Sequence, residues 1–90
     1  MRIQLAPGTS LTEIEGKSVL FSVKTGETYG LNDTAAQMVR LAMAHDVEQA
    51  VDQIARDYDV DVAEIRSDFD DLTRELVKLK FIQLAPDQGS

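Results

Sequence analysis

The sequence predicts an α+β fold in which a small antiparallel sheet is followed by three helices. Up to about residue 31 the apolar residues tend to alternate, as in strands with one buried face, and beyond it they recur every three or four residues, as on one face of a helix. The chain has 90 residues, of which 43% are hydrophobic. We therefore expect a single domain over residues 1–90, with an ordered core at about 10–84.

Three segments of the N-terminal part are expected to be strands. Residues 18–23 show the clearest alternation, and a short connection containing Gly26 leads from them to a return strand at 27–31. A weaker strand is expected at 11–15. Gly30 leaves one face of the return strand almost bare, and a glycine within a strand often marks a place where another backbone comes close.

The three helices are expected to begin at side chains that can cap a helix. The expected caps are Asn32 or Asp33 for the first helix, Asp46 (with Gln49) for the second and Asp61 (with Glu64) for the third. Residues 81–84 form either a final short strand or a packed tail. A three-stranded sheet beside three helices is the make-up of a winged-helix-like domain.

The third helix has the strongest apolar periodicity of the chain. We expect the following stripe to be core: Val62, Ile65, Phe69, Leu72, Leu76 and Leu79. A helical wheel places two different flanks beside this stripe. The mixed flank carries Arg66, Thr73 and Val77, and the acidic flank carries Asp61, Asp68 and Glu75. The mixed flank is the better candidate for a groove, because it is partly apolar.

Charge and composition narrow the kinds of partner. The net charge is −7, from 16 acidic against 9 basic residues, and the bases are scattered, so we expect neither nucleic acid nor an anionic membrane to bind. The chain has no cysteine and no apolar run long enough for a membrane helix, and its N-terminus does not read as a signal peptide. We expect a cytoplasmic protein.

No catalytic or metal-binding pattern is recognisable, so we expect neither an enzyme nor a cofactor. His45 is the single histidine, and no cysteine is present to act as a second ligand. Asp57, Asp59 and Asp61 alternate as in a calcium loop. The glycine and glutamate that such a loop needs at its sixth and twelfth positions are missing, so a solvated turn is the expected structure.

Four segments, taken in order, resemble the PqqD-like family. Residues 19–26 and 29–35 match the family's strand, its T-G turn and the aromatic residue two places before the L-N that leads into the first helix. Residues 58–61 resemble the stretch before the last helix, and 76–82 resemble the closing segment. The resemblance covers nearly the whole chain. It departs at Lys80, where members often place the glycine that ends the helix.

The resemblance implies a non-catalytic, chaperone-like domain that binds the leader of a ribosomally made precursor peptide and presents it to a leader peptidase or another maturation enzyme. In the family the leader adds as a strand to the third strand of the sheet and packs against the third helix. Residues 58–61 are closer to stand-alone members of lasso-peptide pathways than to members of the pyrroloquinoline quinone pathway. The peptide-binding positions carried over are Glu27, Thr28, Tyr29, Gly30, Leu31, Arg66, Phe69, Asp70, Thr73 and Val77.

Two other functions stay open. A winged-helix DNA-binding regulator would fit the same fold, although six acidic residues against two arginines between Asp61 and Glu75 disfavour DNA contact. A scaffold subunit that holds a partner enzyme would use the same exposed edge of the sheet.

Overall fold

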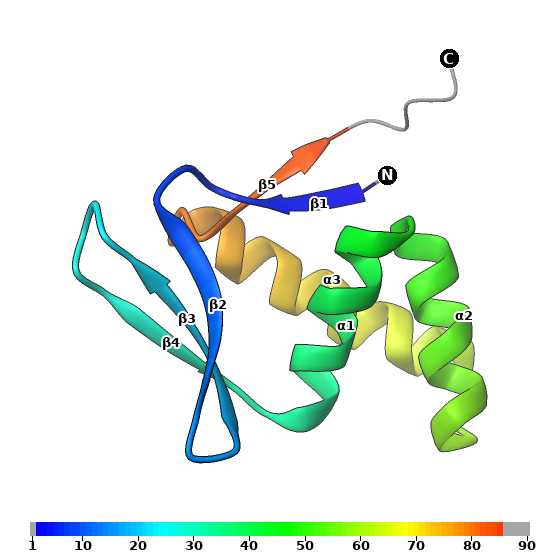
Figure 1. Cartoon of the computed structure of the whole chain (residues 1–90). Coiled ribbons are helices and arrows are strands. Elements are labelled where there is room, and N and C mark those ends of the chain that lie inside the picture. Colours follow the sequence, from blue (N-terminus) through cyan, green and yellow to red (C-terminus); the bar gives the residue numbers. More distant parts are fainter. Residues whose placement is uncertain (1, 86–90) are drawn as a thin grey trace.

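A computed structural model describes residues 2–85 of the chain and shows five strands and three helices there (Figure 1). The predicted fold class is confirmed, because antiparallel strands precede three consecutive helices. In chain order the elements are β1 (Arg2–Leu5), β2 (Thr9–Ile14), β3 (Lys17–Ser22), β4 (Thr28–Leu31), α1 (Asp33–Ala44), α2 (Val47–Tyr58), α3 (Val62–Lys78) and β5 (Ile82–Ala85).

The strands form two separate sheets. One is the predicted three-stranded antiparallel sheet in the order β2-β3-β4, so β4 lies at an edge. The other joins the two ends of the described chain, because β1 pairs with β5 and places Ile3 opposite Leu84. Of the two alternatives for residues 81–84, the strand is therefore confirmed. β1 was not predicted, since two four-residue strands gain stability only by pairing and packing on the rest of the fold.

The helices begin where the sequence predicts, at side chains that accept hydrogen bonds from the first turn. Asn32, Asp46 and Asp61 accept from backbone N–H groups at 2.8, 2.7 and 3.1 Å. The end of α3 explains the departure at Lys80. This residue takes the left-handed conformation (φ 66°), and the N–H groups of residues 80 and 81 donate to the carbonyls of residues 77 and 76. The turn that usually favours glycine is thus present with a lysine.

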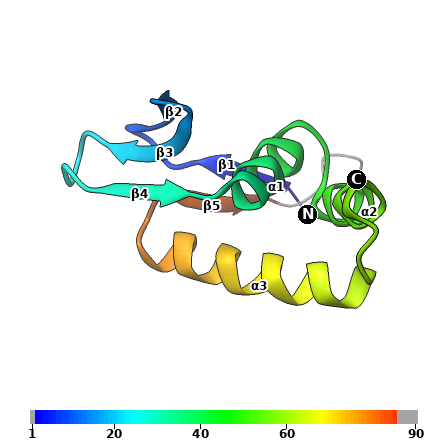
Figure 2. The same ribbon diagram turned by 90° about the horizontal axis from the view of Figure 1, so that it is seen from below.

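One core fills the space between the sheets and the helices. Figure 2 shows α3 as a layer of its own below β4 and β5. The predicted stripe of α3 is only partly core. Ile65, Phe69 and Leu76 are buried, whereas Val62 and Leu79 are 39% and 38% exposed. The stripe fails at its ends because a 3,4 spacing drifts around a helix of 3.6 residues per turn.

Candidate functional site at the edge strand and the third helix

The outer edge of β4 offers unpaired backbone groups. Ser22 N–H donates to the carbonyl of Glu27 (3.0 Å), which marks these two as a hydrogen-bonded pair of the antiparallel ladder. Such pairs alternate along an antiparallel strand, so the odd-numbered residues of β4 bond to β3. Its even-numbered residues, Thr28 and Gly30, therefore direct their N–H and C=O groups away from the sheet. β4 pairs with no strand other than β3 within residues 2–85.

Gly30 stands beside open space. A Cβ atom built at this position meets no atom of the chain within 4 Å, and its φ is not in the left-handed region. The close backbone approach that the glycine suggested is therefore not made by the described part of the chain itself. Neither a turn nor internal packing requires a glycine here.

Tyr29 ties the edge strand to α3. Its hydroxyl donates to Glu75 Oε2 (2.6 Å), and its ring packs edge-on against Phe81 with centroids 5.9 Å apart. The hydrogen bond to Glu75, then burial, then the negative charge of Glu75 raise the pKa of Tyr29 above its ordinary value. Because Glu75 lies on the acidic flank of α3, this flank is the one that faces β4.

The sequence-predicted site residues consequently fall into two places. Glu27, Thr28 and Gly30 are exposed at the sheet edge, Tyr29 is half-buried, and Leu31 is in the core. Of the α3 positions, Thr73 and Val77 each lie two residues from Glu75. Side chains two residues apart on a helix point in opposed directions, so these two do not face β4.

A groove runs along the mixed flank of α3, between it, α2 and β5. Its volume is about 880 Å³, and Arg66, Phe69, Asp70, Thr73 and Val77 all line it. The apolar lining from outside α3 comes from Val47 and Val51 of α2 and from Leu84 of β5. Sequence analysis missed these three, because only the packing of the helices and the β1–β5 pairing brings them to α3.

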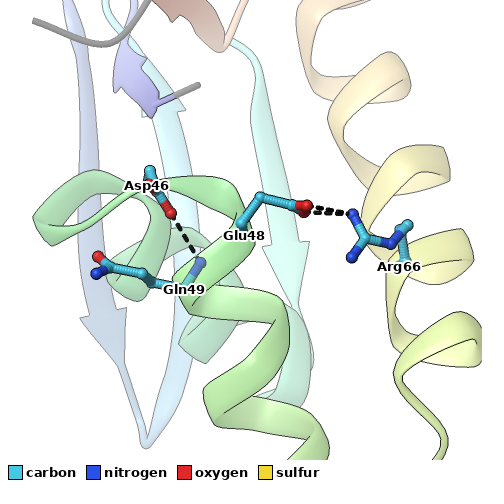
Figure 3. A network of polar contacts seen from close by, with 4 residues as sticks. All are labelled: Asp46, Glu48, Gln49 and Arg66. Atoms are coloured by element: carbon cyan, nitrogen blue, oxygen red, sulfur yellow. Dashed lines mark hydrogen bonds and ion pairs between the residues drawn. The ribbon is translucent and has the colours of Figure 1, made fainter. Parts of the chain in front are cut away.

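Charged side chains line part of the rim of the groove. Figure 3 shows Arg66 reaching across to Glu48 at the start of α2, where its Nη1 contacts both carboxylate oxygens. The hydrogen bond to Glu48 and then the negative charge of Glu48 raise the pKa of Arg66. Arg74 pairs with Asp70 one turn earlier on the same helix (2.8 Å). Lys78 completes the basic part of the lining.

Within residues 2–85, histidine and the acidic side chains form no group of three that could hold a metal ion. In that range, too, no helix has the length and apolar character needed to cross a membrane.

The fold and the open edge define a small winged-helix-like domain with a free strand beside its third helix. The family model for coenzyme PQQ synthesis protein D (PqqD) matches residues 17–82, and the chain belongs to this family. No curated protein matches the chain.

Two solved structures share the fold. Lasso peptide synthetase B1 complexed with the leader peptide has a TM-score of 0.86 and 24% identity, and the match covers 93% of this chain and 100% of that chain. TbiB1 in complex with the TbiA(beta) leader peptide has a TM-score of 0.82 and 24% identity, with 97% of this chain and 100% of that chain covered.

Proposed function

We propose that this chain binds the leader segment of a ribosomally synthesised precursor peptide as an added strand on β4, and presents it to a leader peptidase or another maturation enzyme. The open edge at Thr28 and Gly30 carries the proposal. Membership of the PqqD family supports it, as does the presence of leader peptides in both similar structures. In this proposal the chain binds the peptide without catalysing a reaction, needs no cofactor and acts in the cytoplasm.

Strand addition suits a receptor that must hold a flexible peptide. Main-chain hydrogen bonds supply affinity with little demand on sequence, and pockets for alternate side chains supply choice. Each such bond contributes about 0.5–1.5 kcal/mol net. The outward groups of Thr28 and Gly30 provide two donors and two acceptors, so side-chain contacts must add to them to reach useful affinity after the loss of chain entropy.

The peptide would lie beside the acidic flank of α3. Within the proposed site, Glu27 to Leu31 form the strand to which the leader pairs. Phe69 lies in the core beneath both flanks of α3. Arg66, Asp70, Thr73 and Val77 line the groove on the far side of the helix. They would contact a leader only if it continued past the end of β4 and around α3.

Amide NMR spectra recorded during titration with the leader of the cognate precursor test the proposal. We expect the resonances of residues 27–31 to shift most, together with those of Leu72 and Glu75 on α3. A leader that binds without moving residues 27–31 would show that the edge of β4 is not the site.

DNA binding is tested separately by a mobility-shift assay at low salt, where electrostatic affinity is strongest. We expect no shift, because the helix that would enter the DNA groove carries six acidic residues between Asp61 and Glu75.

A further inference from the structure

We propose that the groove between α2, α3 and β5 docks an acidic, partly apolar segment of the enzyme that receives the peptide, while β4 holds the leader. The inference rests on the proposed function, since it needs a bound leader to deliver. It assigns the mixed flank of α3 to a protein partner rather than to the leader. The two sites would be occupied together.

The floor of the groove is apolar and accessible. Val77 and Leu84 are 38% and 44% exposed, although both are large apolar side chains, and they line the same groove as the buried Val51 and Phe69. A volume of about 880 Å³ lies in the range of roughly 300–1,000 Å³ typical of binding pockets. The groove can therefore take a few apolar side chains of a segment, but not a whole domain.

The charge at the rim selects the kind of segment. Three of the nine bases, Arg66, Arg74 and Lys78, line this groove beside a single acidic residue, Asp70, in a chain whose net charge is −7. Arg66 meets Glu48 through Nη1 and Arg74 meets Asp70 through Nη2, and a guanidinium group carries five N–H donors, so both can also bind a further carboxylate. An acidic segment is repelled by most of this surface and is attracted here.

The position of the groove separates it from the leader. Thr73 and Val77 point away from Glu75, the residue that Tyr29 of β4 contacts. A strand paired with β4 lies on the other side of α3. One partner can therefore be held on each flank of the same helix without steric competition, which is the arrangement that handing a peptide to an enzyme requires.

The first experiment maps the groove with a short synthetic peptide of leucine and glutamate, and with its twin in which lysine replaces glutamate. The chain is saturated with leader beforehand. We expect the glutamate peptide to shift the amides of Val51, Thr73, Val77 and Leu84 and to leave residues 27–31 in their leader-bound positions. Equal binding of the lysine twin would overturn the proposal.

Three other results would also overturn it. If the leader alone shifts the groove amides, the groove belongs to the leader site. If dilution of the free chain shifts them, the occupant is a second copy. If neither peptide shifts them, the groove is not a docking site. Shifts at residues 27–31 on adding leader report separately on the proposed function, so the two failures are distinguishable.

The second experiment measures the affinity of the leader-loaded chain for the purified enzyme that acts on the same precursor. Arg74→Glu reverses an exposed charge at the groove, and Arg56→Glu makes the same change on an exposed position of α2 outside it. We expect about a tenfold loss of affinity for the first and less than about twofold for the second, with leader affinity unchanged in both. Equal losses in the two variants, or no loss, would refute the docking role.

Discussion

The two flanks of α3 differ in how they would hold a partner. On the acidic flank the feature that can bind is backbone, the outer edge of β4, with Glu75 engaged by Tyr29. On the mixed flank the features are side chains, with an apolar floor and the basic side chains of Arg66 and Arg74. A backbone site tolerates changes of side chain and is sensitive to loss of an N–H group, whereas a side-chain site is sensitive to charge and volume.

The largest effect is expected from the core that supports both flanks. Leu76 has no exposed surface, so Leu76→Ala should lower the free energy of unfolding by about 2–5 kcal/mol, because it removes buried methyl groups and leaves a cavity. Denaturation in urea, followed by circular dichroism, measures this. Leu79→Ala is the control, and it should lower stability less because Leu79 is 38% exposed. Similar losses for the two variants would mean that the core is not centred on Leu76.

The next effect is confined to the edge of β4. Gly30→Pro removes an outward N–H and places a ring in the path of an added strand, while no ladder bond to β3 is lost. Leader affinity, measured by calorimetry, should fall at least about tenfold, which corresponds to about 1.4 kcal/mol. The melting temperature should change by only a few degrees.

Gly30→Ala is the matched control, since it keeps the N–H group and its Cβ enters open space. Its affinity for the leader should stay close to that of the parent. An alanine variant as weak as the proline variant would show that the edge is sensitive to the side chain rather than to the backbone. Gly30→Pro and Gly30→Ala should bind the glutamate peptide in the groove equally well.

A smaller effect concerns the contact that ties β4 to the acidic flank. Tyr29→Phe should lower stability by about 1 kcal/mol through loss of the hydrogen bond to Glu75. The pKa of Tyr29 is raised in the folded chain, so the folded state holds the phenolic proton more tightly than the unfolded state does. This stabilisation is complete below the unfolded pKa of about 10 and is lost as the pH rises through the folded pKa.

The parent should therefore be more stable than Tyr29→Phe at pH 8, and this difference in unfolding free energy should disappear at strongly alkaline pH. A difference that stays constant over this interval would argue against the tyrosine–carboxylate bond. Replacement of Tyr58, which donates to Gln37 rather than to a carboxylate, provides a comparison on another part of the surface.

The smallest effect is expected at the rim of the groove. Glu48→Gln removes an exposed ion pair with Arg66 and should change stability little, because solvent screens such a pair. It also leaves the rim more positive, so the glutamate peptide should bind somewhat more tightly and the leader should bind as before. Glu64→Gln, an exposed change on α3 itself, is the control. Tighter binding in both variants would indicate a general charge effect instead of a local one.

Several features were predictable because they depend on neighbouring residues. The caps at Asn32, Asp46 and Asp61 and the hairpin around Gly26 follow from local hydrogen-bonding and turn preferences. The three-stranded sheet and the three helices were predicted for the same reason. At Lys80, where the sequence departs from the family, the helix still ends in the left-handed turn, because the backbone bonds from residues 80 and 81 are retained.

The candidate site was predicted less completely. From the sequence, residues 27–31 were predicted to be an edge strand, and α3 was predicted to have two unlike flanks. The sequence did not show which flank faces β4. This depends on the rotation of the helix, which is set by the packing of Phe69 and Leu76 and by the contact between Tyr29 and Glu75.

By itself, then, the sequence determined the order and type of most elements and the sorting of charge around α3, because periodicity and capping act within a few residues. The tertiary structure decided that β1 joins β5, that Leu84 meets Val51 and Val77 at one groove, and that the open edge of β4 lies on the acidic side. Those outcomes depend on contacts between segments far apart in the chain, where pairing and burial outweigh local preference.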